Sequence, residues 1–504
     1  MSNVTISDAI RYIGVDDKDI DLFESQYIVP NGVSYNSYVI LDEKIVVMDT
    51  VDARKTDEWL EKLERELDGK TPDYLVISHL EPDHSGSIQA IAEKYPQMQF
   101  VSNAKVFAML PQFFEMDVTD KKVVVAEGDT LSLGAHTLTF VMAPMVHWPE
   151  VMVSYESTEK VLFSADAFGK FGALDADEDW ACEARRYYFN IVGKYGAQAA
   201  ALLKKAAGLD IQKICPLHGP ILQENLAYYI GKYQVWSSYE AEDDGVFVAY
   251  ASIHGNTAKA AKKLGEVLEA KGAKKVVVSD LSREDMAEAI EDAFRYDKIV
   301  VACATYDGGL FPVMQDFLYH LGHKNFQNKK VAFMENGSWA PVANKKMREA
   351  FEKMKNCLYQ NNQKMIRQFT EQRRLNAAFS HDLRTPLTIL KGHTTMLLSF
   401  IPKGLVSQQE VLDELSTVRN NVERLEKYVS AMTNLYRLED IEIEKENINF
   451  DFLLKTLSNT TEMLCSDIEY TIKTNCNKQQ TLFINLEIII QIYENLLSNS
   501  IRYA

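Results

Sequence analysis

The chain has 504 residues and a formal net charge of −18 at pH 7. This acidity argues against binding to nucleic acid or to an anionic membrane surface, since both select basic partners. No apolar run approaches the roughly 18 residues of a membrane span, and no cleavable leader is recognised. The six cysteines show neither a CxxC pair nor a framework spacing. We therefore expect a protein of a reducing compartment, the cytoplasm.

The segment His79-Leu80-Glu81-Pro82-Asp83-His84 follows an apolar run at 74–77 that predicts a short buried strand. Four of its six side chains can bind a metal, in the order HxExDH. Dinuclear hydrolases of the metallo-β-lactamase fold carry HxHxDH here. Glu81 replaces the second imidazole by a hard oxygen donor, and mixed shells of this kind favour redox-active iron over zinc. The pattern predicts oxygen or nitric oxide chemistry at two irons rather than hydrolysis.

Three further candidate ligands lie downstream. His147 follows the strand-like segment 138–142, Asp166 follows another apolar run, and His218 follows a strand end with turn residues. Such loops can gather side chains at one rim of a βαβ scaffold. Four other histidines are interpreted as ordinary polar groups near the core: His136, His320, His323 and His393.

Further along, three loops that each follow a predicted strand can form a phosphate and flavin site. The segments 246–250, 298–303 and 330–334 read as buried parallel strands. A helix begins directly after the first loop, so its N-terminal N–H groups and the loop hydroxyls can bind a phosphate. The loops comprise Ser252, Ile253, His254, Gly255, Asn256 and Thr257, then Thr305, Tyr306, Asp307, Gly308, Gly309 and Leu310, then Asn336, Gly337, Ser338, Trp339 and Ala340. In an open parallel sheet ligands bind at the strands' carboxyl ends, and the tyrosine and tryptophan can cover a flat ring.

On these motifs, and on the stretches 183–188 and 217–220, residues 1–356 resemble the flavodiiron proteins, also called A-type flavoproteins. In that family a lactamase-like diiron domain precedes a flavodoxin-like domain that binds FMN. The resemblance implies head-to-tail homodimers, a rubredoxin-like or flavoprotein electron donor, and dioxygen or nitric oxide as substrate. It also implies two non-haem irons, one held by His79, Glu81 and His147 and the other by Asp83, His84 and His218, with Asp166 bridging. Family members differ in whether the imidazole at the position of His84 binds directly.

The composition changes near residue 357. Glycine falls from 21 in the first 356 residues to 2 in the last 148, and the net charge falls from −16 to −2. Only four parallel strands, at 246–250, 275–279, 298–303 and 330–334, precede this point, whereas the flavodoxin fold uses five. We therefore interpret the chain as a fusion of two different proteins that meet near residue 357. This fusion is either native or an artefact of gene fusion or assembly.

The tail carries Phe379-Ser380-His381-Asp382-Leu383-Arg384-Thr385-Pro386-Leu387 within a helical pattern. Asp382 could hold the imidazole tautomer and take its proton while His381 attacks a phosphorus atom. A second helix at 408–438 has heptad-spaced apolar residues. This segment resembles the dimerisation and phosphoacceptor domain of sensor histidine kinases, which implies a homodimer and a response regulator as partner. Asn495 and Asn499 lie in a stretch that resembles the asparagine box, but the glycine-rich boxes do not follow, so we do not expect Mg-ATP binding.

The sequence thus predicts an α/β protein of four domains. They are an αββα metallo-β-lactamase-like domain at 1–242, an incomplete flavodoxin-like doubly wound parallel sheet at 243–356, a helical hairpin at 357–440 and a partial α+β ATPase fragment at 441–504. Three functions compete: a reductase of dioxygen or nitric oxide, a redox-controlled phosphorelay kinase, and a hydrolase. Glu81 and the flavin loops favour the first.

Overall fold

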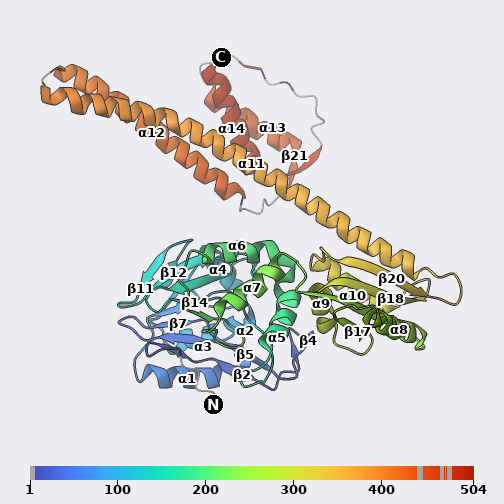
Figure 1. Cartoon of the computed structure of the whole chain (residues 1–504). Coiled ribbons are helices and arrows are strands. Elements are labelled where there is room, and N and C mark those ends of the chain that lie inside the picture. Colours follow the sequence, from blue (N-terminus) through green and yellow to red (C-terminus); the bar gives the residue numbers. More distant parts are fainter. Residues whose placement is uncertain are drawn as a thin grey trace. The chain divides into compact units, whose positions relative to one another are not determined.

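The computed structural model describes residues 6–403, 405–439, 446–465, 470–471, 473 and 480–503. The chain divides into two compact units, Met1–Gln363 and Lys364–Ala504, whose elements are labelled in Figure 1. Across these ranges no helix combines the length and apolar character that a membrane span needs.

The first part of unit 1 contains two mixed sheets of short strands. One has the order β1-β6-β7-β8-β9-β10 and the other the order β11-β12-β13-β14-β15. The strands of the first sheet are Ile10–Tyr12, Tyr38–Ile40, Val46–Met48, Tyr74–Val76, Gln99–Ser102 and Lys122–Val124. Those of the second are Thr130–Ser132, Thr137–Met142, Met152–Glu156, Val161–Phe163 and Lys213–Cys215. Two small pairs accompany them: β2 (Val15–Asp17) with β5 (Val33–Tyr35), and β3 (Leu22–Phe23) with β4 (Tyr27–Ile28).

These two sheets are covered by helices on their outer faces, so the predicted αββα arrangement is confirmed. Val46 and Val76 of the first sheet share one apolar cluster with Phe140 and Met152 of the second, which is the core between the sheets. The helices are α1 (Thr56–Leu67), α2 (Pro82–Ser85), α3 (Ile88–Lys94), α4 (Ala104–Met109), α5 (Trp180–Tyr187), α6 (Gly196–Ala206) and α7 (Leu226–Ser237), and a π-helical turn, Tyr188–Val192, follows α5.

The second part of unit 1 is a parallel sheet of order β17-β16-β18-β20 with helices on both faces (Figure 1). Alternate side chains of β16 pack against helices on opposite faces of the sheet. Val248 packs with α8, and Phe247 belongs to the apolar cluster that includes α9 and α10. The elements are β16 (Asp243–Ala251), α8 (Asn256–Ala270), β17 (Val276–Asp280), α9 (Met286–Arg295), β18 (Tyr296–Tyr306), α10 (Pro312–His323) and β20 (Lys330–Asn336). A short strand not predicted from the sequence, β19 (Gly309–Leu310), pairs antiparallel with the end of β18.

This sheet stops at β20. Among the described residues no fifth strand pairs with its outer edge, as the sequence predicts. The chain continues instead into α11, which runs from Ala343 to Phe400. The helical pattern around residues 379–387 therefore belongs to a helix that begins directly after the last flavin loop, and this helix passes through Pro386 without ending.

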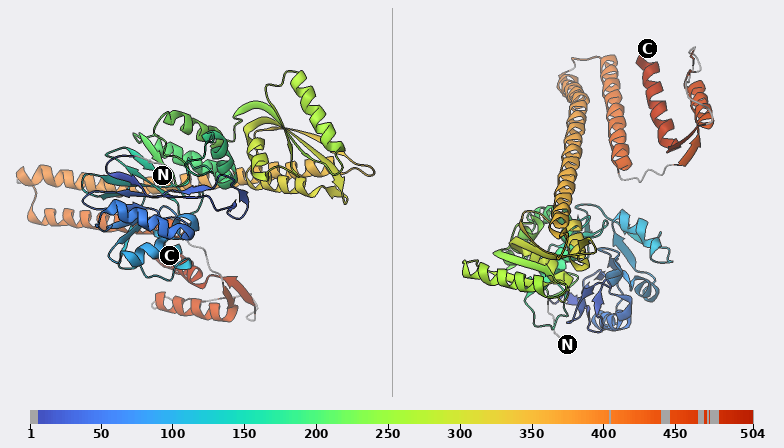
Figure 2. Two further views of the ribbon diagram at one scale, coloured as in Figure 1. Left: turned by 90° about the horizontal axis from the view of Figure 1, so that it is seen from below. Right: turned by 90° about the vertical axis from the view of Figure 1, so that its right-hand side faces the viewer.

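Unit 2 contains the rest of α11, the helix α12 (Gln408–Glu439) and a small α+β fragment. Helices α11 and α12 lie side by side in both views of Figure 2. The fragment consists of the antiparallel pair β21 (Glu446–Asn449) and β22 (Thr481–Ile484) with α13 (Phe450–Leu464) and α14 (Leu486–Tyr503).

Candidate metal and flavin sites

The HxExDH segment leaves β8 and turns at once into α2, with Pro82 in its first turn. Two buried carboxylates fix this turn. Asp49 accepts hydrogen bonds from the backbone N and the Oγ of Ser78, both at 2.6 Å, and Glu150 accepts one from the backbone N of Leu80 at 3.0 Å. Neither carboxylate is predictable from the sequence, because Asp49 and Glu150 lie 29 and 70 residues away from the groups they bind.

The first donor cluster consists of His79, Glu81, His147 and Asp166, whose ligand atoms all lie within 4.8 Å of one another. His147 Nε2 is 2.8 Å from Glu81 Oε2 and 3.1 Å from Asp166 Oδ2. His79 Nε2 is 3.2 Å from the same Asp166 oxygen. Two imidazoles and two carboxylates thus converge on one point, which is an arrangement that suits a divalent metal ion.

The second donor cluster consists of Asp83, His84 and His218. His218 Nε2 is 3.1 Å from Asp83 Oδ2 and 3.3 Å from His84 Nε2. It is also 3.7 Å from Asp166 Oδ1. Asp166 therefore turns one carboxylate oxygen toward each donor cluster, which is the geometry that a bridging ligand requires.

The tautomers of two of these histidines are set by backbone carbonyl groups. His84 Nδ1 lies 3.2 Å from the carbonyl oxygen of Thr50, and His218 Nδ1 lies 2.8 Å from that of Ser34. When each Nδ1 donates to its carbonyl, each Nε2 carries a lone pair that faces the second donor cluster. Metal-binding histidines are commonly oriented in this way.

The donor atoms lack ordinary partners. In the described structure His79 Nε2, His147 Nε2 and both oxygens of Asp83 and Asp166 are buried and make no hydrogen bond. Unpaired buried polar atoms are costly, and cations bound between them offset that cost. Burial would raise the pKa of Asp166, but His79 and His147 hold it well below its usual value. These residues fit two metal ions.

The strands that lead into these ligands are not all part of a βαβ scaffold, so this expectation is corrected. β14 and β15 are parallel, but His147 lies in the connection between the antiparallel strands β12 and β13. The ligands still meet because each lies in a loop at the edge of one of the two packed sheets or, for Asp83 and His84, in the short helix α2 that follows such a loop.

A cavity of about 400 Å³ opens next to the first donor cluster. His147 lines it together with the apolar side chains of Met145, Trp148 and Ile191 and the carboxylate of Glu24. Glu24 lies in the β3–β4 turn, where its φ of 47° is unusual for a residue with a side chain. Glu24 could not be predicted as a cavity residue, since nothing in the sequence of that turn resembles a metal or substrate motif.

The π-helical turn supplies one wall of this cavity. Asn190 lines the cavity, and its carbonyl oxygen accepts hydrogen bonds from Tyr27 Oη at 3.1 Å and from Lys324 Nζ at 2.6 Å. Its side-chain amide donates to the carbonyl of Ala287 at 3.1 Å. The cavity wall is thus attached to the β3–β4 hairpin and to the flavodoxin-like part.

The three predicted flavin loops follow β16, β18 and β20, which are neighbours in the sheet. Ser252 Oγ accepts from the backbone N of Gly255 at 3.1 Å, just before α8 begins. Tyr306 and Trp339 are 42% and 83% exposed, so their rings are available to cover a planar ligand. The loops lie where a flavin can bind, while their individual contacts to it stay predictions.

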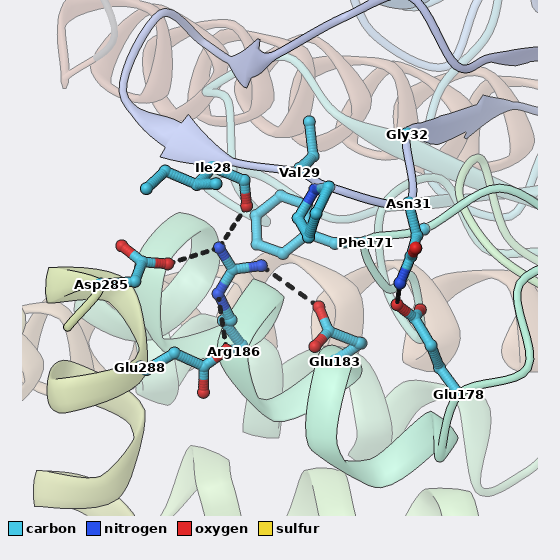
Figure 3. A pocket seen from close by; sticks show the side chains of 12 residues that line it. Ile28, Val29, Asn31, Gly32, Phe171, Glu178, Glu183, Arg186, Asp285 and Glu288 are labelled. Atoms are coloured by element: carbon cyan, nitrogen blue, oxygen red, sulfur yellow. Dashed lines mark hydrogen bonds and ion pairs between the residues drawn. The ribbon is translucent and has the colours of Figure 1, made fainter.

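Two neighbouring arginines of α5 join the lactamase-like and flavodoxin-like parts. Arg186 contacts the carboxylates of Glu183, Asp285 and Glu288 and the carbonyl of Ile28, as Figure 3 shows. Its Nη2 is 2.6 Å from Asp285 Oδ2 on the flavodoxin-like side. The guanidinium is only 3% exposed and lies 4.8 Å from the Phe171 ring centroid. A cavity of about 150 Å³ borders this group.

Arg185 makes the parallel connection. It contacts Glu291 of α9 and, at 3.1 Å, Glu242, whose other partners are Lys232 and Trp236. A third group of potential metal ligands, Cys182, Glu288 and Glu291, lies beside these arginines. Both of its carboxylates are already paired with the arginines, and burial raises the pKa of the Cys182 thiol to about 11. This group is therefore an ionic connection rather than a metal site.

In unit 2 the side chains of His381, Asp382, Asn495 and Asn499 lie outside the described residues, so their predicted roles stay predictions. His393 of α11 and Glu414 of α12 form an ion pair that connects the two helices. Leu412, Leu415 and Val422 of α12 are 41–54% exposed.

Comparison with known proteins agrees with this architecture. Residues 33–219 match the ODP family beta lactamase model, residues 247–374 match a flavodoxin domain, and residues 371–441 match the His Kinase A phosphoacceptor domain. An uncharacterized protein of Methanocaldococcus jannaschii is 31% identical over 360 residues, which cover 69% of this chain and 89% of that relative.

Two proteins of named function are similar over the same region. The anaerobic nitric oxide reductase flavorubredoxin of Vibrio vulnificus is 30% identical over 349 residues, 67% of this chain and 70% of that protein. The structure of rubredoxin oxygen:oxidoreductase from Desulfovibrio gigas has a TM-score of 0.65 at 29% identity, and covers 69% of this chain and 89% of that one.

Proposed function

The chain belongs to the flavodiiron protein family, and we propose that it passes electrons from FMN to a diiron centre that reduces nitric oxide to nitrous oxide, dioxygen to water, or both. One observation carries the proposal. Asp166 places one carboxylate oxygen beside each of two His/carboxylate clusters, in which His79 Nε2, His147 Nε2 and both oxygens of Asp83 are buried without hydrogen-bond partners in the described structure. These atoms can bind two cations that share Asp166 as a ligand.

The donor set favours iron over the hydrolytic metal. Glu81 occupies the place of an imidazole at the first donor cluster, 2.8 Å from His147. Carboxylate and imidazole together suit iron, which can exchange electrons, while zinc cannot. Bound in the two clusters, the irons supply the redox chemistry.

The chain's own residues shape access to that centre. Met145, Trp148 and Ile191 form an apolar part of the neighbouring cavity, beside the polar side chains of Glu24, Gln26 and Asn190, and the cavity has room for a small uncharged gas. Asp49 and Glu150 hold the backbone of the HxExDH turn, and Thr50 and Ser34 orient His84 and His218. These contacts hold the backbone of the turn and the two imidazoles in place, so these groups need not rearrange when the metals bind.

FMN is expected on the flavodoxin-like part, with its phosphate at the start of α8 and its ring between Tyr306 and Trp339. An open parallel sheet places such a ligand at the carboxyl ends of its strands. We expect a rubredoxin-like protein or a flavoprotein to supply electrons, and a homodimer to be the working form.

A second function rests on a different observation. Residues 371–441 match the phosphoacceptor domain, and α11 and α12 form the expected hairpin. The alternative is a phosphorelay protein in which the flavodiiron part is the redox input.

The test uses the full chain loaded with iron and FMN and reduced by a chemical donor. We expect consumption of nitric oxide or dioxygen that Asp166→Ala abolishes and that Asp8→Ala, at a fully exposed carboxylate, leaves unchanged. Tight binding of two zinc ions with lactamase or phosphodiesterase turnover, and no gas reduction, would contradict the proposal.

A further inference from the structure

The helix that follows the last flavin loop does not provide its own N-terminal cap. α11 begins at Ala343, so Val342 occupies the capping position, where an apolar side chain cannot accept a hydrogen bond. The acceptors come from elsewhere. Thr305 Oγ1 accepts from the backbone N of Val342 at 3.0 Å and of Ala343 at 3.2 Å. Glu335 Oε2 accepts from the backbone N of Asn344 at 3.0 Å.

Both acceptors belong to the strand ends that carry the flavin loops. Thr305 begins the second loop at the end of β18, and Glu335 lies at the end of β20, immediately before the third loop. The negative charge of Glu335 also suits the positive end of the helix dipole. The first turn of α11 is therefore capped by residues of the flavin site.

The three loops are connected to one another at the same place. Asn336 Nδ2 donates to Oγ1 of Thr257 in the first loop at 3.3 Å, and Thr257 is buried. Gly337 of the third loop passes beside the same hydroxyl, since a Cβ there would lie in ordinary contact with Thr305 Oγ1, at 3.4 Å. A change in the order of one loop therefore affects the position of the Thr305 hydroxyl, which caps the helix.

The second and third loops combine exposed aromatic rings with residues in the left-handed backbone region. Tyr306 and Trp339 leave large apolar surfaces in water, and Asp307 and Ala340 have φ values of 49° and 43°, which are costly for residues with side chains. A planar ligand that covers the two rings would restrict both loops and thereby fix the position of the Thr305 hydroxyl.

The capped helix is also the one that continues into the kinase-like segment. Ala343 and Met347 are fully buried in the flavodoxin-like core. The same helix runs to Phe400, and the match to the phosphoacceptor domain begins within it, at residue 371.

We propose that the first turn of α11 responds to flavin occupancy: FMN bound in the three loops stabilises this turn through the Thr305 and Glu335 caps. Linkage is reciprocal, so a more stable first turn also strengthens FMN binding. The inference rests on the proposed function only in requiring that FMN binds to these loops.

The experiment compares amide hydrogen exchange in the full chain with FMN bound and with FMN removed. We expect FMN to slow exchange in the peptide that covers 342–346 by roughly fivefold, the size of a typical capping contribution. In Thr305→Ala this FMN effect should vanish, while Thr305→Ser, which keeps a hydroxyl, should retain it. Thr388→Ala removes a hydroxyl from the middle of α11 and serves as the matched control.

A second variant covers the case in which Thr305→Ala no longer binds FMN. Val342→Ser gives the helix a cap of its own, so its first turn should stay protected after FMN removal. Equal exchange at 342–346 with and without FMN in the unmodified chain, or an unchanged FMN effect in Thr305→Ala or Val342→Ser, would overturn the inference. Failure to bind FMN at all would overturn the proposed function as well, whereas normal catalysis with unchanged exchange would overturn only the inference.

Discussion

The metal site and the flavin site differ in how completely the fold builds them. The metal donors lie between two sheets covered on their outer faces, and His79, His84, Asp166 and His218 are at most 1% exposed. The flavin loops lie at the end of a sheet whose edge at β20 is unpaired in the described residues, with Trp339 83% exposed. The first site is organised by the protein core, whereas the rings predicted to bind flavin are exposed at the end of their sheet.

The largest effect is expected at the metal site, from the residue that faces both donor clusters. Asp166→Ala should reduce iron from about two per chain to well below one, because both metals lose a ligand and neighbouring charges become unbalanced. Glu81→Ala should deplete mainly the first donor cluster. Iron analysis after desalting measures both. Asp8→Ala is the control, and an Asp166→Ala chain that keeps two irons would falsify the bridging role.

The next effect concerns the connection between the two parts. Arg186→Met should destabilise the chain by about 3–5 kcal/mol, because Glu183, Asp285 and Glu288 would be left without their buried partner. Denaturant unfolding followed by fluorescence measures the change.

A matched control for this variant is Lys263→Met, which removes an exposed ion pair with Glu266 and should change stability by less than about 1 kcal/mol. Equal effects of the two substitutions would show that the arginine does not hold the two parts together.

The next prediction concerns how tightly FMN is held at the flavin site compared with iron at the metal site. The unpaired edge of β20 leaves part of the FMN domain less restrained, so we expect FMN to be lost gradually during extended dialysis while iron is retained. Flavin absorbance and iron content of the same samples give both quantities. Flavin that remains stoichiometric would show that the second unit or a second chain completes this edge.

The smallest effect is expected at a pair remote from both sites. Burial alone would raise the pKa of Asp42, but hydrogen bonds from the backbone and ring of His136 lower it to about 2. Burial would lower the pKa of His136, but Asp42 raises it. The carboxylate therefore stabilises the fold above its unfolded pKa near 4, and the imidazolium does so below its own near 6.5.

A double-mutant cycle with Asp42→Asn and His136→Ala should give a coupling of about 1 kcal/mol near pH 5.5. The coupling should fall as the pH rises through the raised pKa of His136, and fall again as the pH drops from about 4 toward 2. A coupling that does not change with pH would mean that the contact is neutral.

The sequence predicted what is local or periodic. The αββα architecture, the four parallel strands and the helical hairpin follow from apolar patterns, and the structure gathers all seven proposed metal ligands into two clusters. It did not predict that Arg185 pairs with Glu291 and Arg186 with Asp285, which are 106 and 99 residues away. The cap that Thr305 gives to Ala343, 38 residues along, was equally hidden, because no spacing rule encodes contacts made only by the folded chain.

The π-helical turn at Tyr188–Val192 has a consequence for how a gas reaches the metals. The carbonyl oxygen of Asn190 accepts hydrogen bonds from Tyr27 and Lys324, and its side-chain amide donates to Ala287, so three separate segments of the chain hold this turn. A wall held at three points resists breathing motions, so a gas should enter by diffusion through the open mouth rather than through transient channels. Xenon under pressure should then fill the cavity without displacing this turn.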